Sequence, residues 1–262
     1  MSAVDLTPSG GGTLLFMHVP KTGGTTLRAA LTDAYERPER TLLYGSHAIR
    51  GSYTSEAFRD LPASERAAAR LVYGHFSWGL HESVPGASAY AAVVREPVER
   101  VISVYDHYRH HKGLRFHLLT SRARAADRVA RQRVDIERDG LDLESWIFER
   151  APREVDNQVV RQLTGMPQVP FGACPDTLLD EALDNVRSRF VRLLVLERLA
   201  DDVTALARDI GRPLRLGRRR KVNRRRQRLD AVPAAVRARI AELNRLDIAL
   251  YERAREGTLD VG

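Results

Sequence analysis

The stretch FMHVPKTGGTTL, residues 16–27, decides the fold of this chain. Its first residues complete an apolar run, TLLFMHV (13–19), which predicts a buried strand that stops at Pro20. From Thr25 the pattern becomes helical, because the apolar residues that follow recur at the spacing of one helix face. A strand, a glycine loop and a helix in this order are typical of a phosphate-binding element.

The loop PKTGG has the glycines that such an element needs, because residues without side chains let backbone amides approach an anion closely. The helix that follows adds the positive end of its dipole. Lys21 stands before the glycines, whereas the nucleotide-hydrolase loop G-x-x-x-x-G-K-[ST] has its lysine after them. We therefore expect an anion site of another kind here, and the alternative is a plain glycine turn without a ligand.

Three further apolar runs predict strands, and helical patterns separate them. The runs are LVYGHF (71–76), AYAAVV (89–94) and FVRLLVL (190–196), and the last helix is expected over 233–256. Strands that alternate with helices predict an α/β fold of the P-loop-like, three-layer kind, with a central, mostly parallel sheet flanked by helices.

One domain is expected over residues 13–256, between a flexible N-terminal tail (1–12) and a C-terminal tail (257–262). Within it, residues 36–70 predict a mixture of loop and helix, because Pro and Gly interrupt them. Residues 115–138 predict a charged helical segment on the surface.

The composition of the 262 residues, 43% apolar and 29% charged, is that of an ordinary water-soluble domain. No apolar run reaches the roughly 18–20 residues of a membrane-spanning helix. The first twelve residues lack the basic start and apolar stretch of a signal peptide. Cys174 is the only cysteine, which excludes an internal disulfide and a cysteine-based metal cage. We expect a cytoplasmic protein without a transmembrane segment or a bound metal.

Lysine is rare in this chain, although the net charge is +8. Lys21, Lys112 and Lys221 are its only lysines, so 39 of the 42 basic residues are arginines. A compact ammonium group suits a crowded phosphate site better than the broad guanidinium fork does. The position of Lys21 within the glycine loop therefore favours a role in binding an anion.

The same loop resembles the 5′-phosphosulfate-binding loop of the sulfotransferase superfamily, in the form found in bacterial members and in the heparan or dermatan uronyl 2-O-sulfotransferases. A second segment, AAVVREPVERVISVYDHY (91–108), resembles the superfamily's 3′-phosphate-binding element. The resemblance implies that the donor is 3′-phosphoadenosine-5′-phosphosulfate (PAPS). It implies that the loop residues contact its 5′ side, and that Arg95 and Ser103 hold its 3′-phosphate. The loop residues concerned are Lys21, Thr22, Gly23, Gly24, Thr25 and Thr26.

A third segment, LVYGHFSWGLH (71–81), is similar to the Gly-His-aromatic segment in which the glycan 2-O-sulfotransferases keep a catalytic histidine. Sulfonate transfer needs a base beside the acceptor hydroxyl and a cation to offset the charge that develops on the leaving oxygen. His75 is the candidate for the first role and Lys21 for the second. His47 and an unassigned carboxylate remain alternatives for the base.

The C-terminal half matches the family only in outline. DNQVVRQLTG (156–165) resembles an Asn-Gln segment of bacterial relatives, and the basic segment RLGRRRKVNRRRQR (215–228) stands where relatives cover the nucleotide with a loop. Lys221 and Asn223 in this segment are further candidates for donor binding. An interaction with nucleic acid is the less favoured interpretation of the arginines, because aromatic residues make up only 6% of the chain.

The sequence therefore predicts a PAPS-dependent sulfotransferase that acts on a hydroxyl group. The acceptor stays open among carbohydrates, lipids and small metabolites. A P-loop phosphotransferase of the kinase type is the alternative, because it would use the same strand, loop and helix. Against this alternative, the lysine is misplaced and no acidic magnesium ligand clearly follows a later strand.

Overall fold

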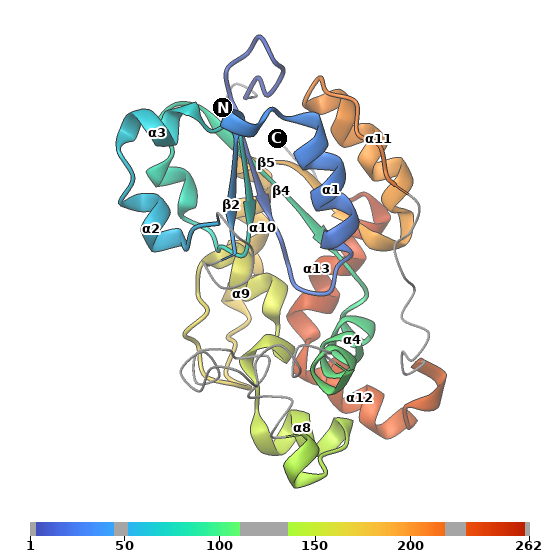
Figure 1. The fold of residues 1–262 in the computed structure, drawn as a ribbon. Coiled ribbons are helices and arrows are strands. Elements are labelled where there is room, and N and C mark those ends of the chain that lie inside the picture. The colour runs from blue at the N-terminus through green and yellow to red at the C-terminus, as the bar shows by residue number, and fades with distance from the viewer. Residues whose placement is uncertain (1–3, 45–51, 111–135, 218–228, 260–262) are drawn as a thin grey trace.

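The computed structural model describes residues 4–44, 52–110, 136–217 and 229–259. Its centre is a sheet of five parallel strands in the order β2-β3-β1-β4-β5, which confirms the predicted α/β fold (Figure 1). The strands are β1 (Thr13–Met17), β2 (Arg40–Leu43), β3 (Leu71–Gly74), β4 (Ser88–Val94) and β5 (Phe190–Val195). β1 lies between β3 and β4, so the predicted anion loop leaves from the middle of the sheet.

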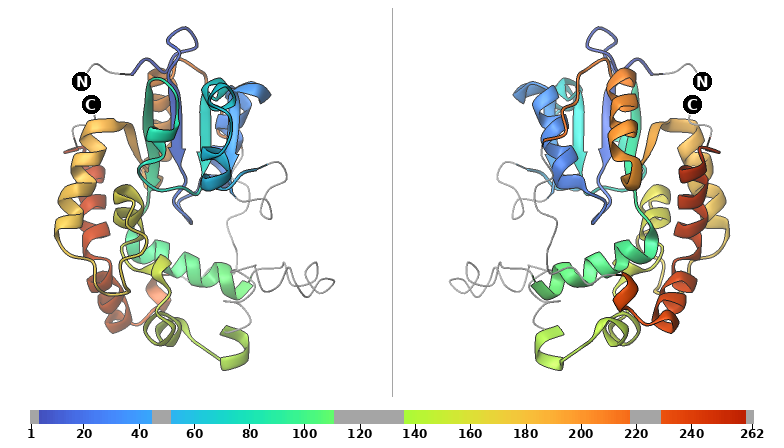
Figure 2. Two further views of the ribbon diagram at one scale, coloured as in Figure 1. Left: turned by 90° about the vertical axis from the view of Figure 1, so that its left-hand side faces the viewer. Right: turned by 90° about the vertical axis from the view of Figure 1, so that its right-hand side faces the viewer.

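Helices cover both faces of the sheet, as Figure 2 shows. On one face, Leu27 and Leu31 of α1 and Leu206 of α11 pack against Leu14 and Phe16 of β1. On the other face, α9, α10 and α13 pack against the side chains that β1, β3, β4 and β5 direct to that side. The bounds are α1 (Gly24–Ala34), α9 (Gln158–Thr164), α10 (Thr177–Arg189), α11 (Leu199–Asp209) and α13 (Arg245–Glu256).

A third hydrophobic cluster lies beyond the carboxyl end of the sheet, and most of its residues belong to helices (Figure 1). Its helices are α4 (Pro97–His110), α8 (Leu143–Arg150) and α12 (Ala234–Leu243). Trp146 is completely buried at its centre. Arg100 of α4 is also completely buried and donates from Nη1 to the Glu154 carbonyl at 2.9 Å.

Residues 36–70 contain an edge strand that the sequence did not predict. β2 is followed by two short helices, α2 (Ser55–Arg59) and α3 (Ala63–Ala68). β2 has the sequence RTLL, and only Leu43 in it is buried. It therefore lacks the continuous apolar run that predicts an inner strand. Single-turn 3₁₀ helices complete the described elements: Arg37–Glu39, Leu80–Ser83, Arg153–Val155, Leu196–Arg198 and Leu229–Ala231.

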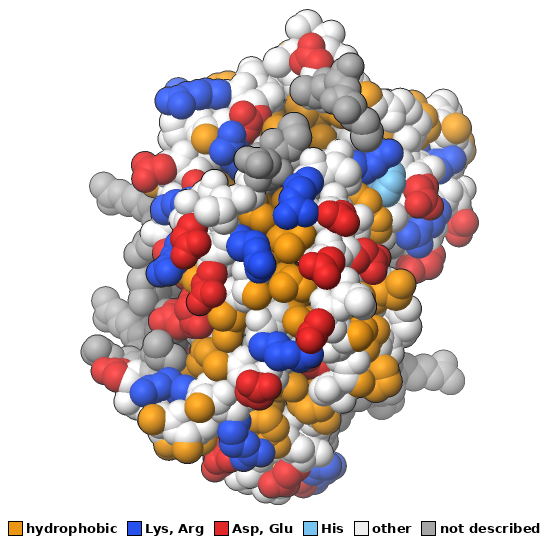
Figure 3. Space-filling view, turned by 180° about the vertical axis from the view of Figure 1, so that it is seen from behind, with side chains coloured by type: hydrophobic (Ala, Val, Ile, Leu, Met, Phe, Trp, Pro, Cys, Tyr) orange, Lys and Arg blue, Asp and Glu red, His pale blue; other side chains and the backbone are white. Residues whose placement is uncertain are grey.

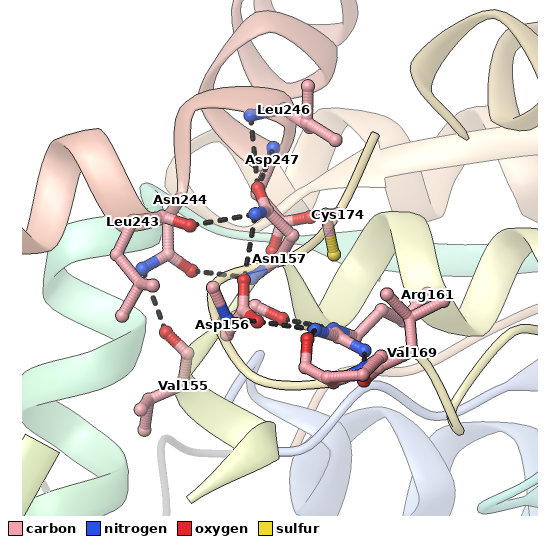
Figure 4. Close-up of polar contacts among 12 residues, drawn as sticks. Val155, Asp156, Asn157, Arg161, Val169, Cys174, Leu243, Asn244, Leu246 and Asp247 are labelled. Carbon is pink, nitrogen blue, oxygen red and sulfur yellow. Dashed lines mark hydrogen bonds and ion pairs between the residues drawn. The ribbon is translucent and has the colours of Figure 1, made fainter. Parts of the chain in front are cut away.

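The single helix predicted over 233–256 is wrong, because the structure divides it at Asn244 into α12 and α13. The Asn244 side chain is buried, and both its amide nitrogen and its amide oxygen form hydrogen bonds. Its Nδ2 donates to the Val155 carbonyl at 2.8 Å, and its Oδ1 accepts from the Asn157 amide at 3.1 Å (Figure 4). These bonds to another segment hold Asn244 out of helical geometry, at φ −110° and ψ 27°.

Residues 4–12, within the predicted N-terminal tail, turn back toward the sheet. The Gly12 amide donates to the Asp5 carbonyl at 2.9 Å, and Leu6 is buried against the core on the α1 and α11 face. The charged segment predicted over 115–138 lies outside the described residues except for its last three. No helix among the described residues is long and apolar enough to cross a membrane.

Basic and acidic side chains are interspersed over the surface seen from behind the view of Figure 1, with apolar side chains between them (Figure 3). Some basic and acidic side chains of the described residues form ion pairs with one another. Arg192 lies 2.6 Å from Asp209, and Arg187 lies 3.0 Å from Asp184.

Candidate active site

Three neighbouring strands direct candidate residues to one edge of the sheet. Met17 at the end of β1 pairs with Gly74 of β3 and with Ala92 of β4. The residues that follow these strands, His18, His75 and Arg95, therefore emerge close together. In open parallel sheets, ligands bind beyond this carboxyl edge.

The anion loop has an unusual backbone. Lys21 has a φ of 73°, a left-handed conformation that is uncommon for a residue with a side chain, and Gly23 has a φ of 82°. The Thr22 hydroxyl fixes the turn by donating to the Val19 carbonyl at 2.8 Å. Gly23 is the N-cap of α1 and no side chain caps the helix, so its first amides are directed into the loop.

Gly24 is needed for packing. A Cβ atom at this position would lie 1.8 Å from Nε2 of His18, far inside van der Waals contact. The absence of a side chain therefore lets the His18 ring lie against the start of α1. Thr25, exposed, and Thr26, half-buried, follow in the first turn of the helix.

Lys21 and Arg95 meet at the loop. Arg95 is buried and donates from Nη1 to the Lys21 carbonyl at 3.2 Å, and its Nη2 forms an ion pair with Glu99 at 2.6 Å. Burial, followed by the charge of Arg95, lowers the pKa of the Lys21 ammonium to about 8, and the charge of Asp106 opposes the shift. An anionic ligand beside this desolvated ammonium would stabilise its charged form and raise its pKa again.

Ser103 lies half-buried on α4, two helical turns beyond Arg95. The start of α4 is fixed by Glu96, whose carboxylate accepts from the Val98 amide at 3.0 Å and from the Glu99 amide at 2.6 Å. Arg95 and Ser103 are thus carried by one strand end and the helix that follows it, as the sequence predicted.

His75 is exposed and its tautomer is defined by its partner. Its Nδ1 lies 3.0 Å from the carbonyl oxygen of His18. Because a carbonyl can only accept, Nδ1 carries the proton, and Nε2 of the neutral ring is left as the free base. Although His75 is exposed, the protein atoms packed around its ring displace enough water to lower its pKa, which keeps the imidazole neutral at neutral pH.

His18 lies beneath His75 in a cluster that the sequence analysis missed. The two imidazole rings are stacked with their centroids 4.6 Å apart, and the Tyr44 ring meets His75 edge-on at 4.7 Å. His18 Nδ1 lies 2.7 Å from the Tyr44 hydroxyl. Burial, followed by the charges of His75, Arg28 and Lys21, lowers the pKa of His18 to about 3, so this ring is neutral too. The one sequence signal is that His18, like His75, directly follows a strand.

Gln162 of α9 is a second contact residue that the sequence analysis missed. It is buried, and its side-chain amide reaches the carbonyl oxygens of Phe76 and His18 on either side of His75. Its segment was noted for its resemblance to relatives, but no pattern distinguished this residue from its neighbours.

Three predicted site residues lie outside the described residues: His47, Lys221 and Asn223. Among the residues that the structure describes, no three His, Cys, Asp or Glu side chains are grouped so that they could hold a metal ion. The described part of the site combines a cationic loop, a buried guanidinium and a neutral imidazole. These groups are suited to binding an anionic group and removing a proton from a neighbouring hydroxyl.

Comparison with known proteins gives a family match and several distant structural likenesses, including the two given below. A sequence model described as "Sulfotransferase family" matches residues 7–169. No curated protein sequence matches the chain significantly. The crystal structure of a sulfotransferase from Alicyclobacillus acidocaldarius is 14% identical, with a TM-score of 0.41 over 96% of each chain. The mouse sulfotransferase SULT7A1, crystallised with PAP, is 12% identical, with a TM-score of 0.40 over 95% of this chain and 68% of the mouse chain.

Proposed function

The chain belongs to the sulfotransferase family, and from this we propose that it transfers a sulfonate group from PAPS to a hydroxyl group of an acceptor. One observation carries the proposal: the Arg95 guanidinium bonds the carbonyl of Lys21, which brings two cations together at the start of α1. PAPS has anionic groups at both its 3′ and its 5′ positions. A pair of cations beside uncapped helix amides suits such a donor.

Lys21 and the loop from Thr22 to Thr26 bind the 5′-phosphosulfate in this proposal. The ammonium neutralises charge on the bridging oxygen as the sulfonate leaves. Arg95 and Ser103 bind the 3′-phosphate, and Lys221 and Asn223 are further candidates for contacts with the donor. Arg95 now forms an ion pair with Glu99 at 2.6 Å. On donor binding, its guanidinium would either leave Glu99 for the phosphate or bond both groups at once.

His75 is the proposed base, because its Nε2 carries no proton in the neutral ring when Nδ1 donates to the His18 carbonyl. It accepts the proton of the acceptor hydroxyl as that oxygen attacks sulfur. A carbohydrate hydroxyl is the first candidate acceptor, by the likeness of residues 71–81 to glycan 2-O-sulfotransferases. Lipids and small metabolites are the other candidates.

The donor can be tested without knowledge of the acceptor. Adenosine 3′,5′-bisphosphate (PAP) should bind at least about tenfold more tightly than ADP, a difference of about 1.4 kcal/mol, because only PAP has a 3′-phosphate. Isothermal titration calorimetry measures both affinities. Arg95→Ala should remove most of the preference, whereas Arg192→Ala should leave it intact, since Arg192 of β5 is paired with Asp209 of α11.

Magnesium distinguishes the proposal from phosphoryl transfer. Added Mg²⁺ should not strengthen the binding of PAP, since sulfonate transfer uses no metal to bridge the donor's oxygens. Equal affinities for PAP and ADP, or binding that depends on Mg²⁺, would contradict the proposed donor.

A further inference from the structure

Gln162 contacts the segment that carries His75 through both its main chain and its side chain. Its carbonyl accepts from the Trp78 amide at 2.9 Å, and its Nε2 donates to the Phe76 carbonyl at 2.7 Å. These two bonds hold the residues on either side of Ser77. Only 4% of Gln162 is exposed, so water competes little for them.

The same amide nitrogen lies 3.4 Å from the carbonyl oxygen of His18. This is the oxygen that accepts the Nδ1 proton of His75 at 3.0 Å. A carbonyl oxygen has two lone pairs, so one oxygen can serve both donors. Gln162 therefore contacts two carbonyl groups beside His75: that of Phe76, the next residue in the chain, and that of His18, which directly follows β1.

The orientation of the Gln162 amide is itself determined. Both groups at Nε2 are carbonyls, which only accept, and Oε1 lies 3.4 Å from Nε2 of Gln158, which donates. A reversed amide would place oxygen against oxygen at the two carbonyls. Only the donating edge of Gln162 can face His75.

The helix that carries Gln162 is firmly seated. The Asp247 carboxylate of α13 accepts from the Val159 amide at 3.0 Å and from the Val160 amide at 2.9 Å, at the first turn of α9. Asn157, just before the helix, donates to the Leu243 carbonyl at 2.7 Å (Figure 4). α9 is thus anchored to the C-terminal helices at one end and reaches the active site one turn later.

We propose that Gln162 is a positioning residue for His75, holding the His18 carbonyl and the Phe76 segment so that His75 keeps its proton on Nδ1 and offers Nε2 to the acceptor. This inference rests on the proposed function only in assigning His75 as the base. Gln162 itself touches neither donor nor acceptor in this role.

Two substitutions test the role. Gln162→Met keeps the volume of the side chain but removes both donors, and Gln162→Glu replaces only the NH₂ group by oxygen. In either variant we expect kcat to fall at least about tenfold, while the affinity for PAP measured by calorimetry stays within about twofold of wild type. Asn185→Ala is the matched control, because its amide also bonds a carbonyl of α9, that of Leu163 at 3.0 Å, away from His75. It should keep the wild-type kcat.

The tautomer of His75 gives a readout that does not depend on activity. The ¹⁵N chemical shifts of the imidazole, assigned by comparison with His75→Ala, should show a proton on Nδ1 in the wild type. They should show a mixture of Nδ1 and Nε2 tautomers in both Gln162 variants. A cooperative thermal unfolding transition establishes that each variant is folded. If Gln162→Met does not fold, the test is made with Gln162→Glu alone.

An unchanged tautomer in a folded Gln162 variant would overturn the inference, whatever happens to its rate. A wild-type Nε2–H tautomer would overturn it as well. Failure of the wild type to bind PAP would instead contradict the proposed donor, and the tautomer measurement would still decide the role of Gln162.

Discussion

Lys21 is a half-buried ammonium group with another cation beside it. Replacing it with alanine should lower kcat by about a hundred- to a thousandfold, since electrostatic groups of this kind contribute roughly 3–4 kcal/mol to transition-state stabilisation. Steady-state kinetics with labelled donor measures the loss, and circular dichroism should show an intact fold. A Lys21→Ala variant that keeps most of its rate would exclude this role.

The pH dependence of donor binding tests the same residue. Because the Lys21 pKa is lowered to about 8, the ammonium loses its proton as the pH rises through 8, and affinity for PAP should fall between pH 7 and 9.5. Lys21→Arg should bind PAP with little change over this range, since arginine keeps its charge. A pH-independent affinity in the wild type would show that the charge of Lys21 is not used.

His75→Ala should lower kcat by about a hundredfold or more and leave the affinity for PAP unchanged, because a general base acts on the acceptor. In the wild type, kcat should fall as the pH is lowered, because the His75 base becomes protonated. Since the protein atoms packed around its ring lower the pKa of His75 from 6.5, that fall should lie below pH 6.5. His81→Ala is the control, as His81 bonds the Tyr90 hydroxyl at 2.9 Å instead. Unchanged activity of His75→Ala would contradict this role and leave His47 or a carboxylate as the candidate base.

At the scale of residues, the sequence could predict that candidate residues following neighbouring strands lie close together. Lys21, Arg95 and His75 follow neighbouring parallel strands, whose carboxyl ends share an edge, so their approach could be expected. Gln162 could not be found in this way. Its partners are the carbonyl oxygens of residues 86 and 144 positions away, and a carbonyl has no sequence signature.

The junction between α9 and the C-terminal helices depends on a few buried polar groups. Asn244 is completely buried, and its Nδ2 donates to the Val155 and Ile240 carbonyls at 2.8 and 2.9 Å. Asn244→Ala should reduce the free energy of unfolding by about 2–4 kcal/mol, because it leaves buried partners unsatisfied. Urea denaturation measures the change. Asn185→Ala, which removes one half-buried bond, should cost about 1 kcal/mol or less, and equal losses for the two variants would contradict this account.

At the scale of elements, the inner strands could be predicted because both their faces are buried and their sequences are continuously apolar. The edge strand β2 could not, since three of its four residues are half-buried. The division of the last helix was equally hidden, because the apolar spacing continues across Asn244. The break depends on Asn157 and Val155, which lie nearly ninety positions earlier.

Donor binding should stabilise the whole molecule. At a PAP concentration of about 100 Kd, linkage adds about 2.7 kcal/mol to the free energy of unfolding. For a chain of this size, that raises Tm by roughly 5–10 °C. Differential scanning fluorimetry should show this shift for the wild type, a smaller one for ADP at the same concentration, and almost none for Arg95→Ala with PAP. Equal shifts for PAP and ADP would contradict a 3′-phosphate site.

The bonds between α9 and α13 join residues 87 and 88 positions apart, and this separation matters while the chain is being synthesised. A ribosome adds roughly 5–20 residues per second, so the first turn of α9 waits roughly 4–18 s for Asp247 to be made. At the start of that interval the nascent polypeptide contains β1 to β4, and β5 is added during it, yet the helix behind His75 has no bond to Asp247. The histidine side of the site is therefore completed last, after translation has passed Asp247.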